Sequence, residues 1–275
     1  MKIKDILLDY KLSLSSTPRL DLDLLIGAAI GKPREFVYVS PGYQLNETEL
    51  ANFKEMYTKR NLGQPISYIL KKKEFWSMEF TVNDQVLVPR PETELLVEIA
   101  LEKINLEEAT VADLGTGCGA IALALAASRP EWKVIATDIS NSALKLASDN
   151  ALAFGISNVN FYHGDWYQAL PEVTLSAIIS NPPYLSDQDG NLTSGDGIRF
   201  EPRSALIAKD NGLDDLSKII QQAKFWLSQD GWLILEHGAS QRLQVIKMLV
   251  ANGYRVIETY QDLAGLDRAV LAKID

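Results

Sequence analysis

From residue 91 onward, short apolar runs typical of strands alternate with segments whose apolar spacing is typical of helices. This alternation favours a mostly parallel sheet with helices on both of its faces. The last two expected strands follow one another without a helix, which predicts an antiparallel edge pair. Seven strands are expected at 110–114, 133–137, 159–162, 175–179, 232–236, 254–260 and 268–274, with helices at 120–128, 140–154, 213–227 and 240–252.

Before this region, the sequence predicts a small helical domain over residues 1–73. Apolar residues recur at helical spacing near the start of the chain. A second helix is expected between Pro18 and Gly31, because proline favours a helix start and glycine a helix end. A third helix is expected to follow Asn46, since Asn46 and Glu49 have the order of a capping box.

Residues 74–90 join the helical domain to the α/β region, which we place at 91–275. Within this linker, the segments Glu74–Phe80 and Gln85–Val88 have strand-like composition and are expected to pair as a hairpin. The chain is therefore expected to be an α/β protein with a helical domain, a linker or hairpin, and a sheet domain.

The net charge of −9 is distributed unevenly along the chain. Residues 1–73 carry a net charge of +4, whereas residues 74–275 carry −13. The negative part is a poor electrostatic match for a nucleic-acid backbone. The positive part could face an acidic partner or could be a solvated surface.

The composition predicts a cytoplasmic protein without a membrane segment. The chain has one cysteine, so it forms no intrachain disulfide, which fits a reducing compartment. The longest apolar run, Cys118–Ala127, is far shorter than the roughly 20 residues of a spanning helix. Charged residues interrupt the N-terminal segment, so no signal peptide is expected.

Three glycines alternate after the first strand of the sheet region, within Asp113-Leu-Gly-Thr-Gly-Cys-Gly119. Glycine has no Cβ, so it permits a tight turn and a close approach of a ligand to the backbone. The spacing differs from that of the dinucleotide and triphosphate loops. Because Asp113 could hold an ammonium group, a nucleotide with an amino-acid tail fits best. The alternative is a tight turn that binds nothing.

Two further segments are candidates for nucleotide binding. Asp138 ends the second strand, 23 residues after Gly115, and a carboxylate at this separation can accept both ribose hydroxyls. The alternative is an acid that caps the helix that begins near Ser140. Trp166 follows the third strand and could line an adenine pocket, or it could be a partly buried loop residue.

Asn181-Pro-Pro-Tyr184 ends the fourth strand and is the most specific signal in the chain. Proline has no N–H, so carbonyl oxygens here are left as acceptors for another group. The Asn181 amide adds an oxygen acceptor, and the Tyr184 ring adds a flat face. This combination suits a planar NH2 group, such as that of an amide or an exocyclic amine.

These features together resemble a class I S-adenosylmethionine-dependent methyltransferase, with a Rossmann-like sheet, that modifies a planar nitrogen. The helical N-terminal domain and five further motifs narrow the resemblance to the HemK/PrmC family of peptide chain release factor glutamine methyltransferases. The motifs are Glu74-Phe-Trp76, Pro89-Arg-Pro-Glu-Thr-Glu94, Asp165-Trp166, Arg199-Phe-Glu-Pro202 and Glu236-His-Gly238. One departure is Cys118, where we expect a small or hydroxylated residue such as threonine.

The resemblance implies a role for each matching residue. The helical domain would recognise the substrate, a class 1 release factor, and Asn181, Pro182 and Tyr184 would be the catalytic residues. S-adenosylmethionine would contact Gly115, Thr116, Gly117, Cys118, Gly119, Asp138, Trp166 and Asn181. The glutamine side chain of the substrate's Gly-Gly-Gln motif would contact Asn181, Pro182, Pro183 and Tyr184.

The expected reaction is direct transfer of the sulfonium methyl group to the glutamine amide nitrogen. The oxygen of Asn181 and the carbonyl of Pro182 would accept the two amide hydrogens. Tyr184 and the prolines would enclose the amide plane. No metal site is expected, because His163 and His237 are the only histidines and no cluster has zinc spacing.

Three alternatives remain open from the sequence. The chain could methylate a glutamine of a ribosomal protein, or the amino group of an adenine in a nucleic acid. It could also bind S-adenosylmethionine without turning it over. The charge of the sheet region disfavours DNA as a partner, and the N-terminal motifs favour a release factor over a ribosomal protein.

Overall fold

The computed structural model describes residues 1–189 and 197–274, which divide into two units. One unit comprises residues 1–72 with 197–200, and the other comprises residues 73–189 with 201–274. Residues 185–211, the polar stretch between the expected strand at 175–179 and the expected helix at 213–227, lie partly outside the described residues.

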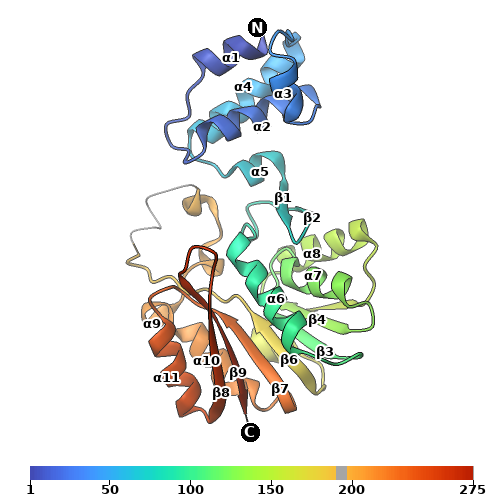
Figure 1. The fold of residues 1–275 in the computed structure, drawn as a ribbon, viewed down its shortest axis with the longest axis vertical. Helices are drawn as coiled ribbons and strands as arrows, with labels where there is room; N and C mark the ends of the chain where they lie inside the picture. Colours follow the sequence, from blue (N-terminus) through green and yellow to red (C-terminus); the bar gives the residue numbers. More distant parts are fainter. Residues whose placement is uncertain (190–196, 275) are drawn as a thin grey trace. The chain divides into compact units, whose positions relative to one another are not determined.

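The first unit is helical, as predicted, and its helix ends follow local sequence rules. In Figure 1 it contains α1 (Ile3–Asp9), α2 (Pro18–Ile30), α3 (Glu35–Val39), α4 (Glu47–Asn61) and α5 (Ile66–Leu70). Proline occupies the first turn of α2, and Gly31 ends that helix in the left-handed conformation with φ 63°. The short helix α5 was not predicted, since it makes little more than one turn after Pro65.

The predicted capping box begins α4. The Asn46 Oδ1 accepts a hydrogen bond from the Glu49 backbone N–H at 2.9 Å. The Glu49 Oε2 accepts one from the Asn46 backbone N–H at 2.8 Å. Two backbone donors at this helix end are thereby satisfied.

Apolar side chains from α1, α2, α3 and α4 form the core of this unit. Phe53 of α4 is fully buried, and the Tyr10 ring packs edge-on against Phe53 and Tyr57. A buried ion pair joins the Arg60 Nε to the Asp21 Oδ2 at 2.5 Å. Removing one partner would leave an uncompensated buried charge, so this pair ties α4 to α2.

The predicted pairing of Glu74–Phe80 with Gln85–Val88 in the linker is wrong. Strands β1 (Lys72–Phe75) and β2 (Met78–Thr81) pair with each other, so the hairpin closes inside the first segment. Trp76 and Ser77 both have positive φ, 54° and 57°, as a two-residue type I′ turn requires. The segment Gln85–Val88 is not a strand.

The second unit contains the predicted seven-stranded sheet, formed in the described residues in the order β5-β4-β3-β6-β7-β9-β8. Its strands are β3 (Thr110–Leu114), β4 (Lys133–Asp138), β5 (Val159–His163), β6 (Leu175–Ser180), β7 (Leu227–Glu236), β8 (Tyr254–Gln261) and β9 (Asp267–Ile274). β3 to β7 pair in parallel. The last two strands pair antiparallel, as predicted, but β9 lies inside the sheet because it also pairs antiparallel with β7.

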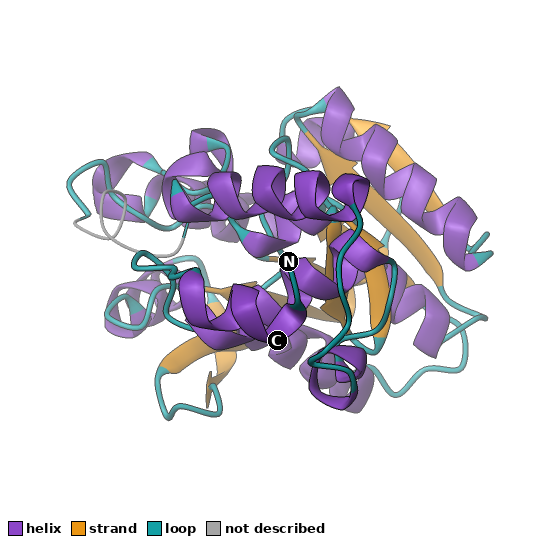
Figure 2. Ribbon diagram, turned by 90° about the horizontal axis from the view of Figure 1, so that it is seen from above, coloured by secondary structure: helices purple, strands orange, loops and turns teal. Residues whose placement is uncertain are grey.

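Helices cover both faces of this sheet, as Figure 2 shows. α6 (Glu94–Lys103), α7 (Ala120–Ser128) and α8 (Asn141–Phe154) pack on one face, and α10 (Asp214–Ala223) and α11 (Arg242–Ala251) pack on the other. Short helices of this unit include η1 (Pro91–Thr93), η2 (Trp166–Ala169), η5 (Arg203–Ala205) and α9 (Lys209–Gly212), whereas η4 (Ile198–Phe200) belongs to the first unit. α6 was not among the predicted helices.

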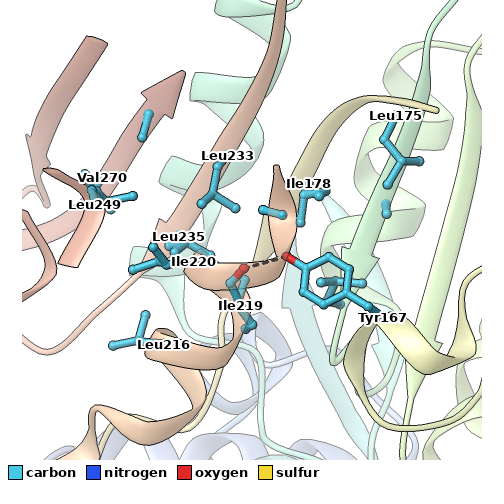
Figure 3. Close-up of a cluster of buried hydrophobic side chains, with 14 of the residues drawn as sticks. Tyr167, Leu175, Ile178, Leu216, Ile219, Ile220, Leu233, Leu235, Leu249 and Val270 are labelled. Carbon is cyan, nitrogen blue, oxygen red and sulfur yellow. Dashed lines mark hydrogen bonds between the residues drawn. The ribbon is translucent and has the colours of Figure 1, made fainter. Parts of the chain in front are cut away.

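The core on the α10 face is apolar and continuous. Figure 3 shows Leu233 and Leu235 of β7 beside Ile219 and Ile220 of α10, all with no exposed surface. The Tyr167 hydroxyl crosses this core and donates to the Ile219 carbonyl at 2.8 Å. Burying a hydroxyl is tolerated only when it is hydrogen-bonded, so this contact fixes η2 against α10.

No helix within the described residues is long and apolar enough to span a membrane.

We expect Asn46→Ala to destabilise α4 by about 1 kcal/mol, because the capping hydrogen bond is lost. Hydrogen exchange of the first α4 amides should accelerate accordingly. Asn61→Ala, at the exposed end of the same helix, is the matched control and should leave these rates unchanged. Equal exchange in the two variants would contradict the capping role.

Candidate functional site

A pocket of about 620 Å³ lies in the second unit, at the carboxyl ends of β3, β4 and β6. In parallel strands these ends share one edge of the sheet, where open α/β sheets bind their ligands. Six of the predicted site residues line this pocket together: Gly115, Gly117, Asp138, Trp166, Asn181 and Pro183. Residues separated by 68 positions in the sequence therefore share one cavity.

The glycine loop is held against the end of β4. The backbone N–H groups of Gly115 and Thr116 both donate to the Thr137 carbonyl, each at 2.9 Å. A Cβ on Gly115 would lie 3.2 Å from the Trp166 ring, whereas a Cβ on Gly117 would meet nothing within 4 Å. The Trp166 ring therefore closes over Gly115, and the backbone at Gly117 is open to a ligand.

Asp113 is hydrogen-bonded to this loop and does not line the pocket. Its Oδ2 accepts hydrogen bonds from the Thr116 hydroxyl at 2.6 Å and the Ala122 N–H at 3.2 Å. Its Oδ1 is buried and has no partner within the described residues. Burial raises the pKa of Asp113 to about 7, although both hydrogen bonds oppose this. The expected contact with a ligand ammonium group stays a prediction.

Asp138 lies between the glycine loop and α8. Its Oδ2 accepts from the Gly117 N–H at 2.9 Å, and its Oδ1 accepts from the Ser140 N–H at 2.8 Å. The helix α8 is capped by the Ser140 hydroxyl, which accepts from the Ala143 N–H, rather than by Asp138. Each oxygen of a carboxylate accepts about two hydrogen bonds, so Asp138 retains capacity for a ligand hydroxyl. Burial raises the pKa of Asp138.

Asn181 follows β6 directly, and its amide is held by a hydrogen-bond chain. The Asn181 Nδ2 donates to the Thr93 Oγ1 at 3.1 Å, and this hydroxyl donates to the Glu236 Oε2 at 2.7 Å. The Tyr184 hydroxyl donates to the Glu236 Oε1 at 3.2 Å. Glu236 is almost fully buried, and burial raises its pKa to about 7.

The pocket lining does not include the other five predicted site residues. The residues that do not line it are Thr116, Cys118, Gly119, Pro182 and Tyr184. The Cys118 side chain is buried, and burial raises the pKa of its thiol to about 12. A thiol with so high a pKa is a poor nucleophile. Contact of these five residues with a ligand, through backbone or side chain, stays a prediction.

Several residues of this site were not predicted from the sequence. Thr93 and Glu236 were parts of motifs without an assigned role, and Pro202 and Lys218 also line the pocket. The buried Glu201 was also not predicted. It accepts hydrogen bonds from the Arg90 guanidinium at 2.5 Å and from the Val88 N–H at 3.2 Å. Thr93, Glu201, Pro202 and Glu236 lie in the charged and proline-rich motifs, which are the signal that could have indicated them, whereas Lys218 lies in no motif.

Across residues 1–189 and 197–274, no three His, Cys, Asp or Glu side chains are grouped as a metal site.

Two family profiles match the chain. The profile described as the methyltransferase small domain matches residues 91–200, and the PrmC N-terminal domain matches residues 10–70. Among solved structures, the hMettl16 catalytic domain with an RNA hairpin has a TM-score of 0.62 at 17% identity, covering 89% of this chain and 93% of that one. A Thermus thermophilus 16S rRNA methyltransferase with AdoMet and guanosine has a TM-score of 0.54 at 18% identity, covering 74% and 50%. At these identities the likeness concerns the fold alone.

The sheet order, the glycine loop and these fold relatives define the class as a Rossmann-like methyltransferase fold with an N-terminal helical region. Release factor glutamine methyltransferases are similar over almost the full length. The relative from Coxiella burnetii is 45% identical and covers 95% of this chain and 94% of the relative. Those from Pseudomonas aeruginosa and Escherichia coli are 42% and 38% identical, covering 98% and 96% of this chain and 97% and 95% of the relatives. The chain belongs to the family of release factor glutamine methyltransferases.

We expect Gly115→Ala to destabilise the second unit more than Gly117→Ala does. Both glycines have positive φ, 77° and 58°, so both substitutions strain the backbone by roughly 1–2 kcal/mol. Only alanine at Gly115 also brings its Cβ to 3.2 Å from the Trp166 ring, so that the ring must shift by a few tenths of an ångström. Urea unfolding followed by tryptophan fluorescence measures the difference, since all 5 tryptophans lie in residues 73–274. Equal midpoints would contradict the contact.

The raised pKa of Asp113 predicts that its contribution to stability decreases as the pH rises from about 4 to about 7. In this window the unfolded carboxyl has lost its proton, whereas the folded carboxyl retains it. The free energy of unfolding should therefore fall less between pH 5 and 7.5 in Asp113→Asn than in the unmodified chain. Exposed Asp149→Asn is the control and should follow the unmodified chain. A parallel decline in all three proteins would refute the assignment.

Proposed function

We propose that this chain transfers the methyl group of S-adenosylmethionine to the side-chain amide nitrogen of the glutamine in the Gly-Gly-Gln motif of class 1 release factors. The observation that carries the proposal is the likeness, over more than nine-tenths of both chains, to relatives named release factor glutamine methyltransferases. The pocket supports the chemistry, because it joins the glycine loop to the Asn181 segment.

The residues of the pocket fit S-adenosylmethionine. Its volume of about 620 Å³ lies within the roughly 300–1,000 Å³ of small-ligand sites. The open backbone at Gly117 admits a close approach, Asp138 has lone pairs for ribose hydroxyls, and Trp166 offers an aromatic face for the base. When bound, this cofactor supplies an electrophilic methyl group on a sulfonium.

Asn181 and Pro182 would hold the substrate amide. The Asn181 Nδ2 is engaged by Thr93, so its oxygen is the end left to accept a substrate hydrogen. The Pro182 carbonyl would accept the second hydrogen. Because the lone pair of an amide nitrogen is delocalised, both acceptors would stabilise the positive charge that develops during transfer.

The transfer needs no strong base before the methyl group moves. The methyl group would pass to the nitrogen that Asn181 and the Pro182 carbonyl hold, with the carbon–sulfur bond of the cofactor as the bond that breaks and S-adenosylhomocysteine as the product. The substrate nitrogen then releases one proton to solvent and returns to a neutral amide. Tyr184 and the prolines would exclude water from the amide plane.

The N-terminal helical unit would recognise the release factor. It matches the PrmC N-terminal domain over residues 10–70, and its net charge of +4 contrasts with −13 for the rest of the chain. A release factor as substrate places the reaction in the cytoplasm. The charge of the sheet region argues against DNA as a substrate.

We expect Asn181→Ala to lower kcat by ~10²–10³, because one acceptor of the developing positive charge is lost. Methyl transfer from labelled S-adenosylmethionine to purified release factors, ribosomal proteins and DNA measures this, with mass spectrometry locating the label. Calorimetry with the cofactor separates a loss of binding from a loss of turnover. Exposed Asn105→Ala, in the second unit and outside the pocket, is the control. Undiminished turnover in Asn181→Ala, or label on DNA alone, would refute the proposal.

A further inference from the structure

Two polar side chains that contact the Asn-Pro-Pro-Tyr segment, Thr93 and Glu236, form with it one connected row of hydrogen bonds. It runs from the Asn181 amide through the Thr93 hydroxyl to the Glu236 carboxylate, which also accepts from Tyr184. We propose that Thr93 and Glu236 are positioning residues that hold the Asn181 amide with its oxygen available to the substrate. This inference rests on the proposed function, since it assigns that oxygen a substrate hydrogen to accept.

The direction of each hydrogen bond follows from the number of protons available. A carboxylate only accepts, and a threonine hydroxyl has one proton and two lone pairs. When Glu236 is ionised, the Thr93 proton is engaged by Glu236, so Thr93 can only accept from Asn181. The NH2 end of Asn181 must then face Thr93, which leaves the oxygen end for a ligand donor.

This orientation must be imposed from outside the side chain. The terminal torsion of an asparagine amide has two broad wells, so the side chain alone does not select one orientation. In the opposite orientation the Asn181 NH2 would meet the substrate NH2, and two donors would oppose each other. The hydroxyl of Thr93 is the group that distinguishes the two orientations.

The fold keeps the three hydrogen-bonded side chains Asn181, Thr93 and Glu236 in place. β6 and β7 pair in parallel with Ser180 opposite Leu235, so the residues that follow, Asn181 and Glu236, share one edge of the sheet. Thr93 ends η1, directly before α6. Thr93 and Glu236 are only 5% and 1% exposed, so water cannot substitute readily for a lost partner.

Protonation of Glu236 would reverse the direction of these hydrogen bonds. A protonated carboxyl can donate to Thr93, whose own proton can then go to the Asn181 oxygen and hold the amide the wrong way round. The groups that act on Glu236 are Thr93, Tyr184, Arg268 of β9 and Glu92 of η1. Burial outweighs the opposing effect of Arg268 and raises the pKa of Glu236 to about 7. We therefore expect kcat to fall as the pH drops below about 7.

Steady-state kinetics with release factor at pH 8 are the first test. Thr93→Val should lower kcat about tenfold, the effect of one hydrogen bond. The KM for release factor and the calorimetric Kd for S-adenosylmethionine should stay within about twofold of the starting values, as positioning requires. Thr93→Ser retains the hydroxyl and should restore kcat. Thr110→Val, at the opposite end of β3, is the matched control.

The pH profile is the second readout. In Glu236→Gln the fall in kcat below about pH 7 should disappear relative to its own plateau, because an amide does not titrate. A structural role for Glu236 would lower the whole profile and leave its shape unchanged. An unchanged acid limb in this variant would overturn the part assigned to Glu236.

A substrate-free measurement separates this inference from the proposed function. In protein labelled with ¹⁵N-asparagine, the Asn181 side-chain NH2 signals are assigned by their loss in Asn181→Ala. These signals should shift in Thr93→Val and stay in place in Thr93→Ser and Thr110→Val. Unmoved signals, or an undiminished kcat in Thr93→Val, would overturn the inference. Shifted signals in a chain that methylates no release factor would refute only the proposed function.

Discussion

Parallel pairing of β3, β4, β6 and β7 is the constraint on which the site depends. Parallel strands end at a common edge, so the residues that follow them meet there without any direct attraction to each other. The glycine loop, Asp138, Asn181 and Glu236 all lie at this edge, although they come from segments more than 100 residues apart. The register of β6 with β7 sets Asn181 beside Glu236.

The same edge brings together three carboxylates that are buried or half-buried. Asp113, Asp138 and Glu236 all have raised pKa values, and burial is the largest cause in each. Each is hydrogen-bonded by backbone N–H or side-chain hydroxyl donors within the described residues. Such donors compensate part of the cost of burial and also fix the orientation of the groups that donate them. In this way the glycine loop is held by two carboxylates and the Asn181 amide by a third.

The sequence predicted those elements whose signals are local. The strand at 110–114 and the helix at 120–128 have the predicted bounds, because a short apolar run and a glycine loop delimit them. The predicted hairpin was wrong, since no local pattern indicated that Trp76 and Ser77 would adopt left-handed conformations. The helix α6 was missed because its apolar residues follow a proline-rich segment that was interpreted only as a motif.

By itself, the sequence determined the class of sheet, the helical character of the N-terminal unit and the residue types that define the pocket. These follow from periodicity, glycine and proline placement, and carboxylates at strand ends, all of which act over a few residues. Only the tertiary structure decided that Trp166 covers Gly115 and that Thr93 connects Asn181 to Glu236. Such contacts depend on strand register and on the packing of separate segments, for which a single sequence has no local signal.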